Sequence, residues 1–191
     1  MSVLRAGAVR NVTAMEKLAK KNVMKVIDLL CERLAFERSG VKLYDTLLSR
    51  LRASDDPALK ALLGDVKEFR EEEKEHEEWL EEQIRALGGD AHAPTEQSVL
   101  VQTEAEGLER VIRRDPSIPH DFHALLTAEL ADNAGWDLLV QLADELGDSD
   151  AKKQFEKRLR EEEKHLSFVR RTLLELTRND VSVPPPSVPA D

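Results

Sequence analysis

Residues 69–80, FREEEKEHEEWL, and residues 158–169, RLREEEKHLSFV, decide the fold of this chain. Each stretch holds a glutamate and a histidine three residues apart, within a run of good helix formers. Residues at that spacing share one face of an α-helix, so both can reach one metal ion from a single helix. One Glu-x-x-His match is common in acidic helices. Two matches carry weight if both lie on the face of the helix that packs inward.

Both pairs interrupt an otherwise apolar face. Alternating steps of three and four residues through the first of these helices give Leu62, Val66, Phe69, Glu73, His76, Leu80, Ile84 and Leu87. The same steps through the second give Phe155, Leu159, Glu162, His165, Val169, Leu173 and Leu176. Two further segments contribute one glutamate each to their inward faces. The first face consists of Ile27, Leu30, Leu34, Glu37, Val41, Tyr44, Leu48 and Leu51. The second consists of Phe122, Leu126, Glu129, Asn133, Trp136, Val140, Ala143 and Leu146. Four helices therefore direct carboxylates toward one core, and two of them also direct imidazoles.

Buried carboxylates in that number require compensation. Four glutamates at one depth would repel one another unless they were protonated or neutralised by cations, and two divalent metal ions would balance their charge. Neutral imidazole nitrogens would complete a mixed oxygen and nitrogen ligand set, which suits iron or manganese. The competing interpretation is that the acidic runs are solvated helix faces. We accept it for the glutamates that lie off the apolar faces, which are Glu71, Glu72, Glu75, Glu161 and Glu163.

Turn and cap residues divide the chain into four long helices. We expect these at about Val23–Leu51, from Pro57 to a stop at Gly88 and Gly89, from after Pro116 and Pro119 to Gly147, and from Asp148–Asp150 to about Thr177. Short turns within the first and second pairs predict two antiparallel hairpins. The connection between the hairpins, Asp90 to His120, holds a helical stretch at Thr103–Arg114 and is long enough to cross the bundle. The predicted fold is an all-α four-helix bundle of two antiparallel helical hairpins joined by a long crossover.

The bundle is expected to occupy residues 23–178. Residues 1–22 would form an N-terminal extension that is partly helical, because Thr13 and Glu16 match a capping box. Residues 179–191 carry four prolines and no periodic apolar pattern, so we expect a disordered tail. A docking peptide for a partner is the alternative role of this tail.

Composition narrows the range of functions. With 41% hydrophobic but only 4% aromatic residues among 191, aliphatic side chains must fill the core, which favours helices. The net charge of -10 argues against nucleic acid and anionic membranes as partners. Cys31 is the only cysteine, so the chain has no internal disulfide and no four-cysteine metal site, and we expect Cys31 to act as a small buried hydrophobe. No apolar run approaches the roughly 20 residues that span a bilayer, and residues 1–14 lack a signal-peptide core, so we expect a cytoplasmic protein.

The two hairpins resemble each other. Glu37 is followed seven residues later by Tyr44, Glu129 is followed seven residues later by Trp136, and each of these helices precedes one that carries Glu-x-x-His. Such a repeat predicts a pseudo-twofold axis between two metals. In these features the chain, from about Val23 to Thr177, resembles the ferritin-like superfamily, including bacterioferritins and rubrerythrins. It lacks the four-cysteine rubredoxin-type domain that many rubrerythrins carry.

The resemblance implies a ligand set that is nearest to the bacterioferritin pattern. In this pattern Glu37 and Glu129 are terminal ligands of opposite metals. Glu73 and Glu162 bridge the two metals, and His76 and His165 each bind one of them.

Three neighbouring residues extend this picture. Tyr44 and Trp136 match inward aromatic positions of the superfamily, from which a hydroxyl or a ring N–H can hydrogen-bond a ligand carboxylate. Core packing is the alternative for both, and we favour it for Trp136. Asp132 lies where rubrerythrins carry an additional carboxylate, although the side chain of aspartate is shorter.

The resemblance implies a redox protein. A centre of two iron ions would react with dioxygen or peroxide and oxidise ferrous iron, as a ferroxidase or peroxidase-type oxidoreductase does. Manganese accepts similar ligands, so a dimanganese catalase-like enzyme stays open, as does a metal-free helical adaptor. A proline-rich tail stands where storage ferritins have a further helix, which favours a monomer or a homodimer over a cage.

Overall fold

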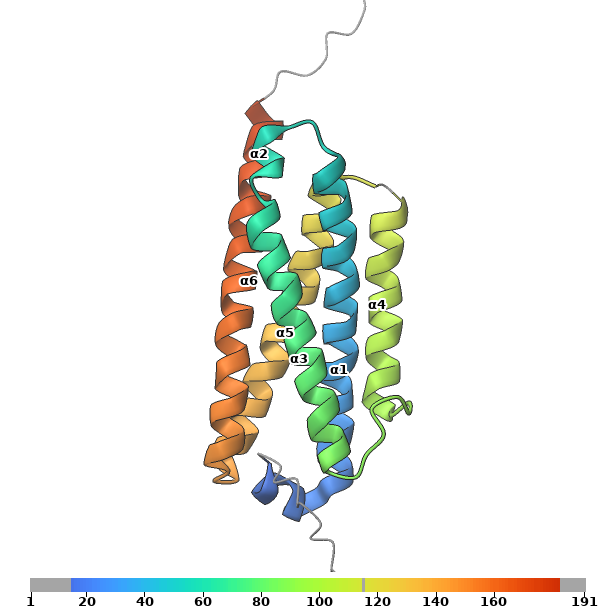
Figure 1. Ribbon diagram of the computed structural model, residues 1–191, viewed down its shortest axis with the longest axis vertical. Coiled ribbons are helices and arrows are strands. Elements are labelled where there is room, and N and C mark those ends of the chain that lie inside the picture. Colours follow the sequence, from blue (N-terminus) through green and yellow to red (C-terminus); the bar gives the residue numbers. More distant parts are fainter. Residues whose placement is uncertain (1–14, 115, 183–191) are drawn as a thin grey trace, which may run out of the picture.

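The computed structural model describes residues 15–114 and 116–182. Its helices are α1 (Glu16–Ala53), α2 (Pro57–Lys60), α3 (Leu63–Ala86), α4 (Glu96–Arg114), α5 (Ile118–Glu145) and α6 (Ser149–Ser182). α1 and α3 form one antiparallel hairpin, α5 and α6 form the second, and α4 runs along the bundle beside α1 (Figure 1). No strand occurs within the described ranges, so the predicted all-α bundle with a long crossover is confirmed.

Helix ends follow local sequence signals. Asp56 caps α2 by accepting a hydrogen bond from the amide of Ala58 at 2.8 Å, and Pro57 occupies the first turn. Glycines with positive φ follow α3 and α5, namely Gly88 at 85° and Gly147 at 68°. Side chains other than glycine rarely adopt this conformation, so the two glycines end their helices as the sequence predicts.

Three boundaries differ from the sequence expectations. The second predicted helix is interrupted at residues 61–62, which separates α2 from α3. α5 begins at Ile118 with Ser117 as its cap, so Pro119 lies inside the first turn, where its missing amide N–H is not needed. α6 continues to Ser182, into the segment expected to belong to the tail. Residues 183–191 and the predicted cap Thr13 lie outside the described residues.

The crossover is more helical than its sequence suggests. α4 starts well before the predicted Thr103, because Thr95 and Ser98 cap it reciprocally. The amide of Thr95 donates to Oγ of Ser98 at 2.9 Å, and the amide of Ser98 donates to Oγ1 of Thr95 at 3.3 Å. Asp28 on α1 accepts a hydrogen bond from the amide of Gln97 at 3.1 Å, which ties the start of α4 to the bundle.

The N-terminal part of α1 is bent away from the rest. Asn22 leaves helical geometry with φ -158° and ψ 88°, and its side chain accepts a hydrogen bond from the amide of Lys25 at 3.1 Å. Asn22 therefore acts as an internal cap, and the straight part of α1 begins at Val23, as expected.

Asp148 joins this N-terminal segment to the turn between α5 and α6. One carboxylate oxygen accepts hydrogen bonds from the amides of Lys17 and Leu18 at 2.8 and 3.0 Å, and the other accepts one from the amide of Ala151 at 3.3 Å. A single side chain thus caps both α6 and the start of α1, where Met15 offers no side-chain cap. Asp148 is 3% exposed, and its bonds to the amides of Leu18 and Ala151 are buried.

The core consists of two apolar clusters, one toward each end of the bundle. The first includes Leu30 and Phe155, and the second includes Leu47 and Phe122. Cys31 is buried in the first cluster, as expected. Along each of α1, α3, α5 and α6, the predicted glutamates and histidines fall in the sequence interval between the two clusters.

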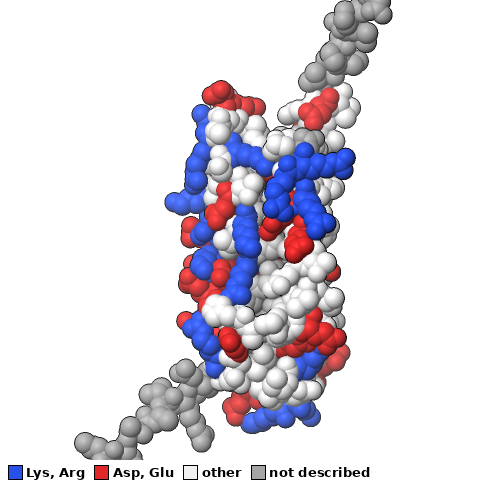
Figure 2. Space-filling view, turned by 90° about the vertical axis from the view of Figure 1, so that its right-hand side faces the viewer, with Lys and Arg blue, Asp and Glu red and all other residues white. Residues whose placement is uncertain are grey.

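The surface is highly charged. On the face that carries α4, basic and acidic side chains are intermingled around an uncharged area (Figure 2). Within the described residues, no helix is long and apolar enough to cross a membrane.

Candidate metal centre

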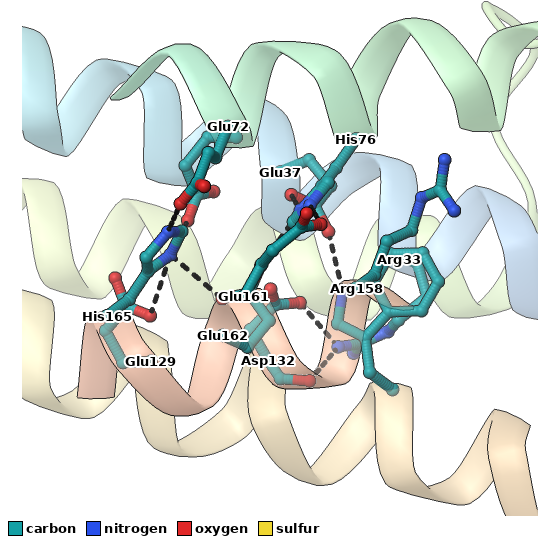
Figure 3. Close-up of polar contacts among 12 residues, drawn as sticks. Arg33, Glu37, Glu72, His76, Glu129, Asp132, Arg158, Glu161, Glu162 and His165 are labelled. Atoms are coloured by element: carbon teal, nitrogen blue, oxygen red, sulfur yellow. Dashed lines mark hydrogen bonds and ion pairs between the residues drawn. The ribbon is translucent and has the colours of Figure 1, made fainter. Parts of the chain in front are cut away.

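The layer between the two apolar clusters contains all six side chains that the sequence identifies as ligand candidates. Figure 3 shows Glu37, His76, Glu129, Glu162 and His165 among them. None of them is more than 3% exposed. They come from all four helices of the bundle, with Glu37 on α1, Glu73 and His76 on α3, Glu129 on α5, and Glu162 and His165 on α6. The helical periodicity therefore places six polar groups at one depth in an apolar interior.

His76 faces one group of carboxylates. Its Nδ1 atom lies 2.9 Å from Oε1 of Glu162 and 3.3 Å from Oε2 of Glu37. One donor atom from each of these three residues lies within 4.8 Å of the others, which is close enough for all three to share one ion.

His165 faces a second group. Its Nδ1 atom lies 3.3 Å from Glu73, 3.3 Å from Glu162 and 3.8 Å from Glu129. Donor atoms of these four residues also lie within 4.8 Å of one another. Glu162 belongs to both groups, so it lies between two positions that could each hold a metal ion.

Several buried polar atoms of the cluster have no hydrogen-bond partner among the described residues. They are Oε2 of Glu37, Oε2 of Glu129, both carboxylate oxygens of Glu162, and Nδ1 of His76 and of His165. The short contacts of the two Nδ1 atoms lack hydrogen-bond geometry. Buried polar groups are nearly always hydrogen-bonded, so converging atoms without partners indicate room for an ion. Carboxylate oxygens and imidazole nitrogens are donors that iron and manganese accept, and the residues therefore fit a dinuclear metal site.

Protons compensate part of this charge when no cation is bound. Burial, followed by the charge of Glu162, raises the pKa of Glu129 to about 8 and the pKa of Glu73 well above its usual range. Burial also disfavours ionised Glu162, but contacts with His165 and His76 outweigh it and hold the pKa of Glu162 below its usual range. Burial likewise opposes charged imidazoles, yet the adjacent carboxylates raise the pKa of both histidines. Protons and metal ions would thus compete for the same atoms.

Two aromatic side chains hydrogen-bond carboxylates across the bundle. The hydroxyl of Tyr44 donates to Oε1 of Glu129, and Nε1 of Trp136 donates to Oε1 of Glu37 at 2.9 Å. The two bonds follow the internal repeat, because the residue seven positions after each glutamate reaches the glutamate of the other hairpin. The prediction that Trp136 serves core packing therefore covers only part of its role. Its ring packs in the core, and its N–H also donates a hydrogen bond to Glu37.

The outer nitrogen of each histidine contacts a glutamate that the sequence analysis assigned to solvent. Nε2 of His165 lies 2.8 Å from Glu72, and Nε2 of His76 lies 3.0 Å from Glu161. The side chains of Glu72 and Glu161 are only 20% and 16% exposed, so the prediction that both are solvated is wrong. Each immediately precedes the inward-facing glutamate of its own helix and reaches across to the other hairpin. The repeated Glu-Glu-x-x-His spacing is the sequence pattern that could have predicted the contacts of Glu72 and Glu161 with the histidines.

Asp132 lies beside the cluster and is paired with a buried arginine. Nη1 of Arg33 donates to Oδ1 of Asp132 at 2.7 Å and to its backbone oxygen at 3.0 Å. Gly135 leaves room for this arginine, because a Cβ there would lie 2.0 Å from its Cζ atom. Oδ2 of Asp132 has no hydrogen-bond partner in the described parts of the chain. A donor atom of Asp132 lies within 4.8 Å of donor atoms from three glutamates of the cluster, so its short side chain does reach.

Arg158 is a second buried cation that the sequence analysis missed. Its Cζ atom lies 3.6 Å from the centre of the Trp79 ring. Burial lowers the pKa of Arg158 to about 10, although the charge of Glu37 opposes this shift. Arg158 and Arg33 both lie beside the cluster (Figure 3). The signal for Arg158 was its position four residues before Glu162, which places the two on one helix face.

Comparison with protein families agrees with this geometry. The family model described as Rubrerythrin matches residues 28–173, which is most of the chain and includes every residue of the cluster. Comparison with curated proteins gives no match. Because Cys31 is the only cysteine, the chain has no rubredoxin-type four-cysteine site. The chain belongs to the rubrerythrin family of the ferritin-like superfamily.

Proposed function

We propose that this protein binds two iron ions in the buried cluster and uses them to reduce dioxygen or hydrogen peroxide. The observation that carries the proposal is the set of ligand atoms from four helices that converge without hydrogen-bond partners. Membership of the rubrerythrin family supports iron as the metal. Two ferrous ions would supply two electrons, which together with two protons reduce dioxygen to hydrogen peroxide, or hydrogen peroxide to two waters.

The geometry supports a division of the ligands between two positions. Glu162 would be shared by both ions, because it belongs to both groups of donor atoms. The remaining ligands would be Glu37 and His76 for one ion, Glu129 and His165 for the other, and Glu73 as a second shared carboxylate.

The surrounding residues would orient these ligands. Glu72 and Glu161 accept the Nε2–H of the histidines, which leaves the Nδ1 lone pairs facing the metal positions. Tyr44 and Trp136 each occupy one oxygen of a carboxylate and leave the other oxygen free to bind. Burial, followed by the charge of Glu129, raises the pKa of Tyr44, so its hydroxyl keeps its proton and remains a donor at neutral pH.

Anaerobic titration with ferrous iron tests the proposal. We expect two ions per chain, and a near-ultraviolet absorbance that develops when air or hydrogen peroxide is admitted. Peroxide breakdown that requires manganese, in protein that does not oxidise ferrous iron, would instead favour the dimanganese catalase. Failure to bind either metal would contradict both enzymes.

Substitution of a shared carboxylate tests the ligand assignment. Glu162→Ala should weaken both ions together, by more than the roughly 10- to 100-fold that loss of an outer hydrogen-bond partner costs. Glu71→Ala is a matched control from the other Glu-x-x-His helix, because the side chain of Glu71 is 57% exposed. Glu72→Ala is not suitable as a control, since Glu72 contacts His165. Equal metal affinities for Glu162→Ala and Glu71→Ala, measured by calorimetry, would rule the assignment out.

A further inference from the structure

A narrow space reaches the cluster between α1 and α5. Its lining consists of Phe36, Gly40, Ala128 and three carboxylate residues, Glu73, Glu129 and Asp132. The volume of this space is about 10 Å³, roughly that of one water-sized sphere. Phe36 is the only half-buried member of this lining, so its side of the space lies nearest to the exterior.

Two residues of this lining carry an oxygen that the other described residues leave without a hydrogen bond. Oε2 of Glu129 and Oδ2 of Asp132 are buried and have no hydrogen-bond partner in the parts of the chain that the structure describes. Between α3 and α6, Glu72 and Glu161 lie against the outer nitrogens of the two imidazoles. In the proposed centre Oε2 of Glu129 would bind a metal ion, so Oδ2 of Asp132 would remain as the free acceptor beside this space.

The rim of the opening is held in place by packing. Cζ of Arg33 lies 4.5 Å from the centre of the Phe36 ring, and the same guanidinium binds Asp132. At Gly40 a Cβ would lie 2.1 Å from Oε2 of Glu73, so a larger residue would displace that carboxylate. The methyl group of Ala128 forms the remaining side of the space. A larger side chain at this position would narrow the space without breaking a hydrogen bond, because the side chain of alanine makes none.

We propose that this α1–α5 opening is the route by which small exogenous molecules reach the metal centre, and that Ala128 sets its width. The inference rests on the proposed dinuclear centre. A route with room for one water-sized molecule passes azide, dioxygen and hydrogen peroxide. It excludes hydroperoxides with a bulky organic group, because the methyl group of Ala128, opposite the ring of Phe36 and the backbone at Gly40, leaves no space for one.

Azide binding to the full-length protein loaded with Co(II) tests the route without redox chemistry. The rate is followed by stopped-flow visible absorbance. Ala128→Leu should slow azide association about tenfold or more, because the longer side chain fills the space that azide must cross. Ala131→Leu is the matched control, since Ala131 is exposed on the same helix and does not line the opening. Its azide rate should equal that of the unaltered protein.

The outcomes separate the route from the centre. If the unaltered protein gives no cobalt spectrum, the dinuclear centre itself is refuted, and the route with it. If Ala128→Leu binds cobalt normally and azide at the unaltered rate, the route is refuted and the centre stands.

Ala128→Gly gives a second readout if leucine lowers the cobalt stoichiometry. In ferrous-loaded protein, this substitution should raise the rate of oxidation by cumene hydroperoxide relative to hydrogen peroxide. An unchanged ratio of the two rates would overturn the role of Ala128.

Discussion

At the scale of single residues, hydrogen bonds between the two hairpins fix the positions of two candidate ligands. Tyr44 of the first hairpin binds Glu129 of the second, and Trp136 of the second binds Glu37 of the first. Buried polar groups are costly when they lack partners, so neither hairpin could satisfy these carboxylates alone. The cluster therefore depends on both halves of the internal repeat.

Loss of an outer contact to one histidine should weaken metal binding. Glu161→Ala removes the carboxylate 3.0 Å from Nε2 of His76, so the imidazole loses its orienting partner. We expect the affinity for Co(II), measured by titration calorimetry, to fall about 10- to 100-fold. Glu163→Ala, at an exposed position two residues further along α6, should leave the affinity unchanged. Equal affinities for these two variants would show that the contact does not support the metal.

At the scale of the helices, one residue caps two helices that are far apart in the sequence. The start of α1 has no side-chain cap of its own, and Asp148, from the α5–α6 turn, supplies one. The same carboxylate caps α6. Two helix starts that are far apart in the sequence therefore depend on one aspartate.

Asp148→Ala should destabilise the fold. The substitution removes a helix cap, which costs about 1 kcal/mol, and leaves the buried amide of Leu18 unsatisfied, which costs roughly 1–3 kcal/mol more. We expect the free energy of unfolding, from urea denaturation, to fall by about 2–4 kcal/mol. Asp150→Ala removes an exposed carboxylate from the first turn of the same helix, so its effect should stay below about 1 kcal/mol. An Asp148→Ala variant as stable as Asp150→Ala would contradict the double-cap interpretation.

In the molecule as a whole, the buried cluster links stability to pH. The pKa of Glu129 is about 8 in the fold, against a usual value of 4.5. Between these values the folded state keeps a proton that the unfolded state has released. The stabilisation is therefore complete below the unfolded value and is lost as pH rises through about 8. The raised pKa values of Glu73, His76 and His165 act in the same direction.

Metal-free protein should consequently melt at a lower temperature at pH 9 than at pH 6, as measured by scanning calorimetry after chelation. Saturating divalent metal should raise the melting temperature at both pH values, because the metal binds the folded state selectively. It should also weaken the pH trend, since ions replace the protons. A metal-free melting temperature that increased from pH 6 to pH 9 would show that the carboxylates are not protonated in the fold.

Local sequence alone determined the four main helices, their hairpin order and the six inward-facing polar side chains, but not the break between α2 and α3 or the early start of α4. Helical periodicity and cap residues such as Gly88 and Gly147 act within a few residues, and a charge on an apolar face, such as Glu37 or Glu162, is visible without coordinates. The two copies of Glu-x-x-His then indicated the ferritin-like superfamily, within which the family model identifies the rubrerythrin family.

Only the tertiary structure decided which groups meet across helices. Glu72 and Glu161 lie at the edge of an apolar face, where a side chain turns either to solvent or to a neighbouring helix. The choice depends on the separation and rotation of the packed helices, which no local pattern specifies. The same holds for Arg33 with Asp132 and for the opening beside Ala128, because each is formed by α1 and α5 together.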